Sequence, residues 1–173
     1  MENKKLNMEN DYFSPQWAPL RILLIVSLLI AWISAACIGK TGALYESQYE
    51  STKIGFLVIS IAAFCTSIFI FILNVIELPV KSKLPWDFVF AVVDIVFALA
   101  IVGISVAAAC AEAIANSLTY KSINKGAFAV AASFGFLAFI LYVIIIIVEL
   151  IQVSKNLKNT EETKETSYQR EEI

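Results

Sequence analysis

The sequence predicts an all-α integral membrane protein, an antiparallel four-helix transmembrane bundle with both termini in the cytosol. The first observation is composition: apolar residues make up 59% of the 173-residue chain, above the share of about 45–50% that is usual in soluble domains. The second is their grouping into four long stretches, each near the roughly 20 residues that a helix needs to cross a bilayer. The third is the shortness of the segments between them, which leaves no room for a further domain. The four predicted spans are residues 20–38, 54–78, 88–111 and 127–151.

The first apolar stretch follows a polar N-terminal tail, residues 1–19. It is longer than the 7–15 or so apolar residues of a signal-peptide core, and acidic residues offset the lysines before it, so we expect a retained span. The second and third stretches are separated by a short connection, which predicts that these two helices are antiparallel neighbours. The fourth is followed by residues 154–173, a polar segment that we expect to be a disordered cytosolic tail.

The third span begins with a sequence typical of a helix start at a membrane surface, Leu84-Pro85-Trp86-Asp87. Proline is tolerated in the first turn, an acid there meets the positive end of the helix dipole, and tryptophan favours the interface. We therefore expect Trp86 and Asp87, together with Arg21 of the first span, to lie at the cytosolic interface.

The distribution of basic residues sets the orientation. Nine lysines and arginines fall on the side of the two termini and four on the opposite side. Because basic segments resist translocation, this bias places both termini in the cytosol.

Several function classes are excluded by what the sequence lacks. The chain has no histidine and a net charge of −2, so it offers no histidine-based metal site, proton relay or catalytic triad and no field for nucleic acid. A glycine-rich phosphate loop is also missing. We therefore expect a protein that is not an enzyme and that binds no cofactor, metal or nucleic acid.

Three cysteines, Cys37, Cys65 and Cys110, fall inside or at the rim of the predicted spans. The simplest interpretation is that they are small apolar packing residues. The alternative is a Cys37–Cys110 disulfide, since both lie near the same membrane face and oxidising conditions there would permit one.

Small residues recur at four-residue spacing in three spans, a pattern that lets helix backbones approach closely in lipid. We expect these positions to pack helices together: Ala31, Ala35 and Gly39; Gly103, Ala107 and Ala111; and Ala127, Ala131 and Gly135.

Asp94 is the most unusual residue of the predicted spans. It lies seven positions after Asp87, about 10 Å deeper at 1.5 Å per residue. We find no lysine or arginine at that depth, so Asp94 should be protonated, hydrated or hydrogen-bonded. Ser27, Asn74 and Tyr142 are candidate partners in one buried polar layer. This layer is either a clasp that sets helix rotation or a proton or cation site.

Three other acids lie near helix ends. Glu77 and Glu149 fall on the cytosolic side, within reach of Arg21 or nearby lysines, and Glu112 falls at the outer rim. These acids are explained by side chains that extend to the membrane surface or by ion pairs at the membrane rim. The C-terminal Glu171, Glu172 and Ile173 form a candidate tail motif, since a free carboxylate and a terminal isoleucine suit a backbone nest and pocket; an unstructured tail that ends in isoleucine by chance is the alternative.

With these features the chain resembles MARVEL-domain proteins, in particular the group that contains the chemokine-like factor family, myelin and lymphocyte protein, and plasmolipin. The resemblance covers about residues 17–155. It is carried by Leu84-Pro85-Trp86-Asp87-Phe88 leading to Ala98 and Ser105 in the third span, and by Ala131-Ala132-Ser133-Phe134-Gly135-Phe136-Leu137-Ala138 and Leu141-Tyr142 in the fourth. Members often carry Asn or Asp three residues after this tyrosine, where the chain has Ile145, and Asp94 has no family counterpart.

The resemblance implies a role in vesicle traffic and membrane apposition: sorting cargo, organising sterol-rich patches or chaperoning membrane proteins. We therefore expect a non-enzymatic membrane organiser or trafficking adaptor at the plasma membrane or in secretory or endosomal vesicles. Its expected partners are the lipid bilayer, other membrane proteins and further copies of the chain. The alternative is a small oligomeric transporter or channel in which Asp94 is a buried coupling acid.

Overall fold

The computed structural model describes residues 17–38, 46–76, 86–117 and 126–171, which form four α-helices and no strand in these ranges. The helices are α2 (Trp17–Ala36), α3 (Glu46–Val75), α5 (Trp86–Ser117) and α6 (Ala127–Glu171). Each contains a segment long and apolar enough to cross a membrane: Ala18–Ala36, Glu50–Val75, Phe88–Ile114 and Ala127–Ile151. The sequence-based prediction of a helical, multi-pass membrane protein is confirmed at this level.

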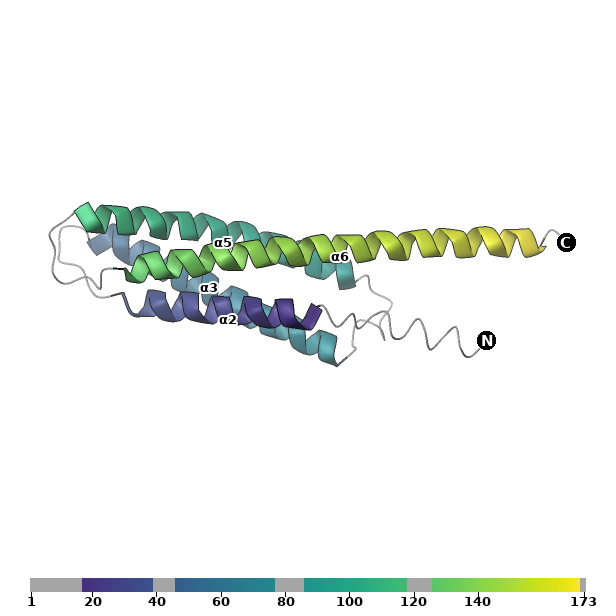
Figure 1. Ribbon diagram of the computed structural model, residues 1–173, viewed down its shortest axis with the longest axis horizontal. Coiled ribbons are helices and arrows are strands. Elements are labelled where there is room, and N and C mark those ends of the chain that lie inside the picture. Colours follow the sequence, from purple (N-terminus) through teal and green to yellow (C-terminus); the bar gives the residue numbers. More distant parts are fainter. Residues whose placement is uncertain (1–16, 39–45, 77–85, 118–125, 172–173) are drawn as a thin grey trace.

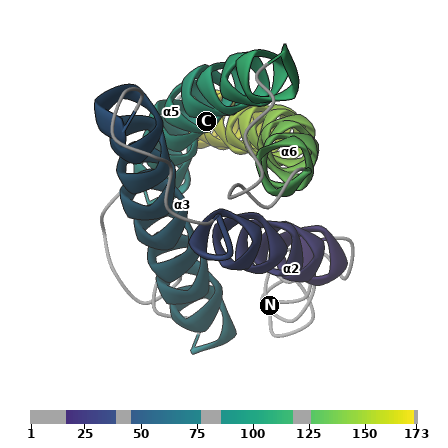
Figure 2. The same cartoon turned by 90° about the vertical axis from the view of Figure 1, so that its left-hand side faces the viewer.

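The four helices lie alongside one another, and the first residues of α2 are at the same end of the bundle as the C-terminal extension of α6 (Figure 1). Seen end-on they surround a common centre, with α3 strongly inclined to the others (Figure 2). Each helix packs against two neighbours: α2 against α3 and α6, and α5 against α3 and α6. This ring leaves one face of every helix inward, and the outward faces carry large apolar side chains that suit contact with lipid.

Two helices extend beyond the predicted spans at the end of the bundle that lies opposite the first residues of α2. Helix α3 begins at Glu46 and α5 continues to Ser117, although the sequence-based spans begin at residue 54 and end at residue 111. The added segments contain neither glycine nor proline, so nothing in them breaks a helix. Hydropathy locates the bilayer, whereas helix ends depend on helix breakers and caps.

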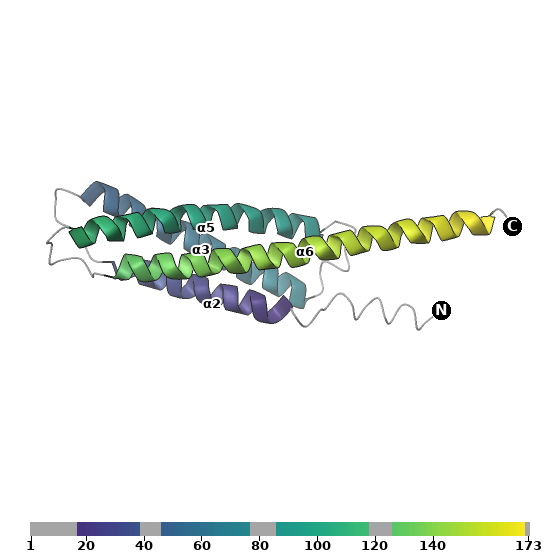
Figure 3. The same ribbon diagram turned by 45° about the horizontal axis from the view of Figure 1, so that its top comes forward.

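The segment after the fourth span also differs from the expectation. Residues 154–173 are predicted to be a disordered tail, whereas α6 continues as a helix to Glu171. The extension past Ile151 projects away from the other helices (Figure 3) and is about 30 Å long at 1.5 Å per residue. No glycine follows Gly135 and no proline follows Pro85, and a helix already nucleated within the bundle propagates at little cost.

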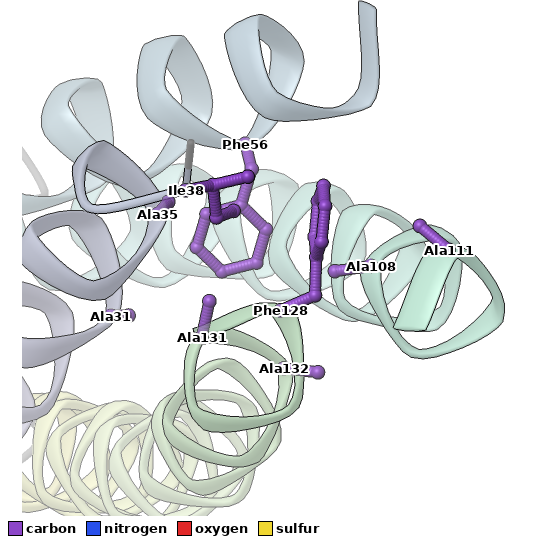
Figure 4. Close-up of a cluster of buried hydrophobic side chains, with 9 residues drawn as sticks. All are labelled: Ala31, Ala35, Ile38, Phe56, Ala108, Ala111, Phe128, Ala131 and Ala132. Carbon is purple, nitrogen blue, oxygen red and sulfur yellow. The ribbon is translucent and has the colours of Figure 1, made fainter. Parts of the chain in front are cut away.

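The core consists of two clusters stacked along the bundle. One lies near the end opposite the first residues of α2, where the rings of Phe56 and Phe128 fill the space between alanines of α2, α5 and α6 (Figure 4). The other surrounds Leu24, Leu28 and Tyr142. Alanine on three helices lets the backbones approach closely, and the aromatic rings fill the volume that remains.

Candidate functional site

A buried charge cluster joins α2, α5 and α6. Arg21 donates a hydrogen bond from Nη1 to Asp94 Oδ1 at 3.0 Å, and its Nη2 lies 2.8 Å from Asp94 Oδ2. The same Nη2 donates to Glu149 Oε1 at 3.3 Å. None of the three side chains exposes more than 2% of its surface. One guanidinium is therefore shared, unequally, by carboxyl groups from two other helices.

Helical periodicity brings these three residues inward. On α5, Asp94 belongs to a buried row with Ala98, Ile101, Ser105 and Ala108, spaced by three or four residues. This spacing keeps one face toward the core.

On α6, Glu149 continues a second buried row, with Ala138, Tyr142 and Ile145. Arg21 is the fifth residue of α2, so its long side chain can extend from the end of that helix toward both carboxyl groups.

Burial makes this cluster energetically sensitive. A charged group inside a membrane-spanning bundle is tolerated only where opposite charges or hydrogen bonds compensate for its lost hydration. Two nitrogens of the planar guanidinium contact Asp94 and Glu149 at once, a spread of donors that the compact ammonium of a lysine does not have. The cluster can therefore hold three helices in one rotation and can bind or release protons. These are the two kinds of role that the sequence suggests for Asp94.

Arg21 corrects one sequence-based expectation and confirms another. No basic residue is expected near Asp94, and this is wrong because Arg21 is buried and contacts Asp94. Glu149 is expected within reach of Arg21, and the two are in contact at 3.3 Å. Residue counting measures the depth of the backbone and not the reach of a long side chain. A signal was present in the sequence: Arg21, Asp94 and Glu149 are ionisable residues of opposite sign within the apolar stretches on the same side of the bilayer.

In the described structure Ser27, Asn74 and Tyr142, the predicted polar layer, make no hydrogen bond with Asp94. Ser27 donates to the Leu23 carbonyl of its own helix at 2.8 Å, and Asn74 is half-buried with no hydrogen bond to Asp94 in the described structure. Tyr142 is fully buried, and its hydroxyl is hydrogen-bonded to Ser67 Oγ at 3.1 Å. That bond joins α6 to α3, so all four helices take part in buried polar contacts.

The predicted small-residue positions differ in how far they are buried. Ala31, Ala35, Ala131 and Gly135 are buried, as expected for helix packing. Their neighbours on other helices therefore approach closely. Of the other predicted positions, Ala111 is buried, Ala107 and Ala127 are half-buried, Gly103 is exposed, and Gly39 lies outside the described residues.

The expectation for Gly103 is wrong, and that for Ala107 holds only in part. Gly103 lies two residues from both Ile101 and Ser105, members of the buried row of α5, so helical rotation turns it outward. A Cβ atom built on Gly103 meets nothing within 4 Å. The same atom on Gly135 would lie 2.0 Å from Ser105 Oγ and 3.2 Å from Ser105 Cβ. Gly135 is thus the glycine that α5 and α6 require in order to pack.

Charged side chains also form hydrogen bonds with backbone groups at helix ends, at the end of the bundle that lies opposite the first residues of α2. Glu112 of α5 accepts a hydrogen bond on Oε1 from the Gly126 N–H at 2.9 Å. The Gly126 carbonyl in turn accepts from Val130 at 2.9 Å, so Gly126, with φ of 92°, precedes the first turn of α6. Lys53 of α3 donates from Nζ to the Ile38 carbonyl just beyond α2. Each charge has the sign that the neighbouring helix end favours.

The remaining predicted site residues have simpler outcomes. Trp86 begins α5, and its ring lies 5.6 Å from that of Phe90, centroid to centroid. Cys110 is a free thiol, so it forms no disulfide with Cys37. Asp87 is a residue of α5 and Glu171 is the last residue of α6, but their side chains, like Glu77, Glu172 and Ile173, lie outside what the structure describes.

Within the described residues, no group of three or more His, Cys, Asp or Glu side chains is arranged to hold a metal ion. The charge cluster is thus the strongest candidate functional site that the structure provides. Comparison with known proteins adds no family: no protein-family model, no curated protein and no solved structure matches the chain.

Proposed function

We propose that this protein is a non-enzymatic membrane organiser or trafficking adaptor, built as an antiparallel bundle with both termini in the cytosol. The observation that carries the proposal is the division of the bundle into an interior where the charged side chains contact one another's opposite charge and an apolar exterior. Arg21 binds both Asp94 and Glu149 inside it, while Leu99 and Val58 expose 66% and 62% of their surfaces on the outside. Such a molecule acts through its lipid-facing surface and its ends.

Two further features support this proposal. The first is the resemblance to MARVEL-domain proteins, whose implied roles are cargo sorting and the organisation of sterol-rich membrane at the plasma membrane and in secretory or endosomal vesicles. The second is the helical extension of α6, which continues to Glu171 beyond the apolar segment that ends at Ile151. It would offer cytosolic partners a handle that ends in the candidate motif Glu171-Glu172-Ile173.

Proximity labelling tests the proposal. A labelling enzyme is fused to the C-terminus of the full chain, and labelled membrane proteins are compared with those of an unrelated four-span protein expressed at the same level. Selective enrichment of vesicle machinery or of a few cargo proteins is the expected result. A set of labelled proteins indistinguishable from the control would contradict the proposal. Repeating the experiment with residues 171–173 deleted shows whether the terminal motif is needed.

The second candidate is a small oligomeric transporter or channel with Asp94 as its coupling acid. The observation that favours it is the presence of three ionisable side chains inside the predicted bilayer segments, where such groups are rare and usually functional. Proton or cation flux through reconstituted liposomes, lost in Asp94→Asn, would support it. Flux no greater than that of empty liposomes would dismiss it.

A further inference from the structure

The inward face of α3 is not covered over its whole length. Its buried side chains recur at spacings of three or four residues, which places them on one face of the helix. They are Phe56, Ser60, Ala63, Ser67 and Ile70, and none exposes more than 2% of its surface. Asn74 follows Ile70 by four residues and continues this row, but it is half-buried. None of the described residues of α3 beyond Ile70 is buried.

The tilt of α3 explains this change. Helix α3 is strongly inclined to the other helices, so its C-terminal end lies away from α5 and α6 (Figure 1, Figure 2). The other helices remain packed at that end of the bundle, where Arg21 of α2, Phe90 of α5 and Glu149 of α6 expose no more than 4% of their surfaces. Within the described structure, the interior is therefore partly uncovered beside the last turn of α3.

Asn74 lies at about the level of the charge cluster. Ser67 of α3 is hydrogen-bonded to Tyr142 of α6 at 3.1 Å, so these two residues share one level of the bundle. Both helices run toward the end at which α2 begins (Figure 1). Asn74 and Glu149 each follow by seven residues, about 10 Å at 1.5 Å per residue. The fourth helix therefore presents an amide at the level where the other three present their charges.

Asn74 and Asp94 both have hydrogen-bonding capacity that the described side chains leave unused. Asn74 makes no hydrogen bond or ion pair in the described structure. Asp94 Oδ2 lies 2.8 Å from Arg21 Nη2 but accepts no hydrogen bond. A carboxamide offers two N–H donors and a carboxylate several acceptor sites. Polar groups that do not meet directly inside a protein are commonly joined by ordered water, which needs two to four polar partners.

We propose that water enters the bundle beside the last turn of α3 and bridges the Asn74 carboxamide to Asp94 Oδ2. This water hydrates the charge cluster from the end of the bundle at which α2 begins. A lipid chain in the same place would leave both groups without hydrogen bonds, at a large free-energy cost. The proposal goes beyond membrane organisation and does not depend on it, because an organiser and a transporter can both contain a hydrated charge cluster.

Thiol accessibility in lipid vesicles tests the entry of water. The full chain, with its three cysteines replaced by alanine, receives Asn74→Cys, Ile72→Cys or Ile76→Cys. Ile72 and Ile76 are 45% and 54% exposed on the outward face, and they lie on either side of Asn74 along the helix. Permeabilised vesicles let a membrane-impermeant thiosulfonate reach both membrane faces, so the orientation of the protein does not affect the result.

Asn74→Cys should react at least about tenfold faster than both controls, because the reactive thiolate forms in water and not in lipid. Since the two controls bracket Asn74 in depth, such a difference reports the face of the helix and not the distance from the surface. A rate for Asn74→Cys no greater than that of either control would overturn the proposal.

Solid-state NMR tests the bridge on the wild-type chain in bilayers, with ¹³C at the aspartate carboxyl. The chain has three aspartates, Asp11, Asp87 and Asp94, and Asp94→Asn identifies the third signal. Magnetisation from mobile water should reach the Asp94 carboxyl in the wild type, and its transfer should be slower in Asn74→Leu, an apolar change of similar shape. No transfer to Asp94 in the wild type, or the same rate in Asn74→Leu, would contradict the bridge.

Discussion

Arg21 and Asp94, which are 73 residues apart in the chain, are joined by one hydrogen bond of 3.0 Å and one further charge contact of 2.8 Å in the interior of the bundle. The pair joins the beginning of α2 to the first half of α5, two helices that otherwise pack mainly against α3 and α6. With Glu149 it connects three of the four helices. The stability of the bundle should therefore depend on this cluster more than on any lipid-facing residue.

The first prediction concerns the charge cluster. Arg21→Met leaves Asp94 and Glu149 buried without their guanidinium, and we expect a loss of about 3–5 kcal/mol in the free energy of unfolding. Asp94→Asn should cost less, because Glu149 can still pair with Arg21. Unfolding in mixed detergent micelles, followed by circular dichroism, measures both losses.

The matched control for this series is Ile22→Met, the neighbouring residue of α2, which is 49% exposed on the lipid side. A change within about 0.5 kcal/mol is expected there. Equal stability of Arg21→Met and Ile22→Met would show that the cluster contributes nothing to folding.

The second prediction concerns the contact between α5 and α6. Gly135→Ala places a Cβ atom 2.0 Å from Ser105 Oγ and 3.2 Å from Ser105 Cβ. The hydroxyl can rotate away but the Cβ atom cannot, so the helices must separate, at a cost of about 1–3 kcal/mol. Thermal unfolding in detergent should show the loss.

Gly103→Ala on α5 is the control for this substitution, because a Cβ atom on Gly103 meets nothing within 4 Å. Its stability should match or slightly exceed that of the wild type, since alanine favours helix more than glycine does. Adding Ser105→Gly to Gly135→Ala should restore part of the loss. Equal effects of the two alanine substitutions would contradict the proposed close approach.

The third prediction concerns the hydrogen bond between Tyr142 and Ser67, at 3.1 Å. Tyr142→Phe removes one neutral hydrogen bond and should cost about 0.5–1.5 kcal/mol. Ser67→Ala should cost somewhat more, about 1–3 kcal/mol, because it leaves the buried tyrosine hydroxyl without this partner. The double variant should lose less than the sum of the two single losses. Strict additivity would mean that the two hydroxyl groups do not interact.

The fourth prediction concerns the beginning of α6. Glu112→Ala removes the acceptor of the Gly126 N–H, and we expect a loss of about 0.5–2 kcal/mol, as for other helix caps. Hydrogen exchange should accelerate at Gly126 and in the first turn of α6 but not around Tyr142. Glu112→Gln keeps a carbonyl acceptor and should lie between the wild type and the alanine variant. An unchanged rate of hydrogen exchange at Gly126 would show that Glu112 does not cap α6.

Local composition was enough to predict the class of the fold. Four apolar stretches predicted four membrane-spanning helices because the length of a span depends on the thickness of the bilayer, and Ala31, Ala35, Ala131 and Gly135 were correctly placed in helix contacts. Helix ends were less predictable, as shown by α6, whose helix continues to Glu171. Its length depends on the absence of helix breakers and not on hydropathy.

The sequence predicted one part of the candidate site and missed the other. A buried Asp94 was predicted from its position in an apolar stretch, since the cost of an acid in lipid is a property of the residue and its depth. Its partner was not predicted, because the partner depends on how α2 and α5 are rotated and on how far Arg21 extends. The same rotation turned Gly103 outward and Ser105 inward. Sequence alone determined which segments enter the membrane; tertiary packing decided which faces meet, because contact between helices depends on azimuth and side-chain reach as well as on composition.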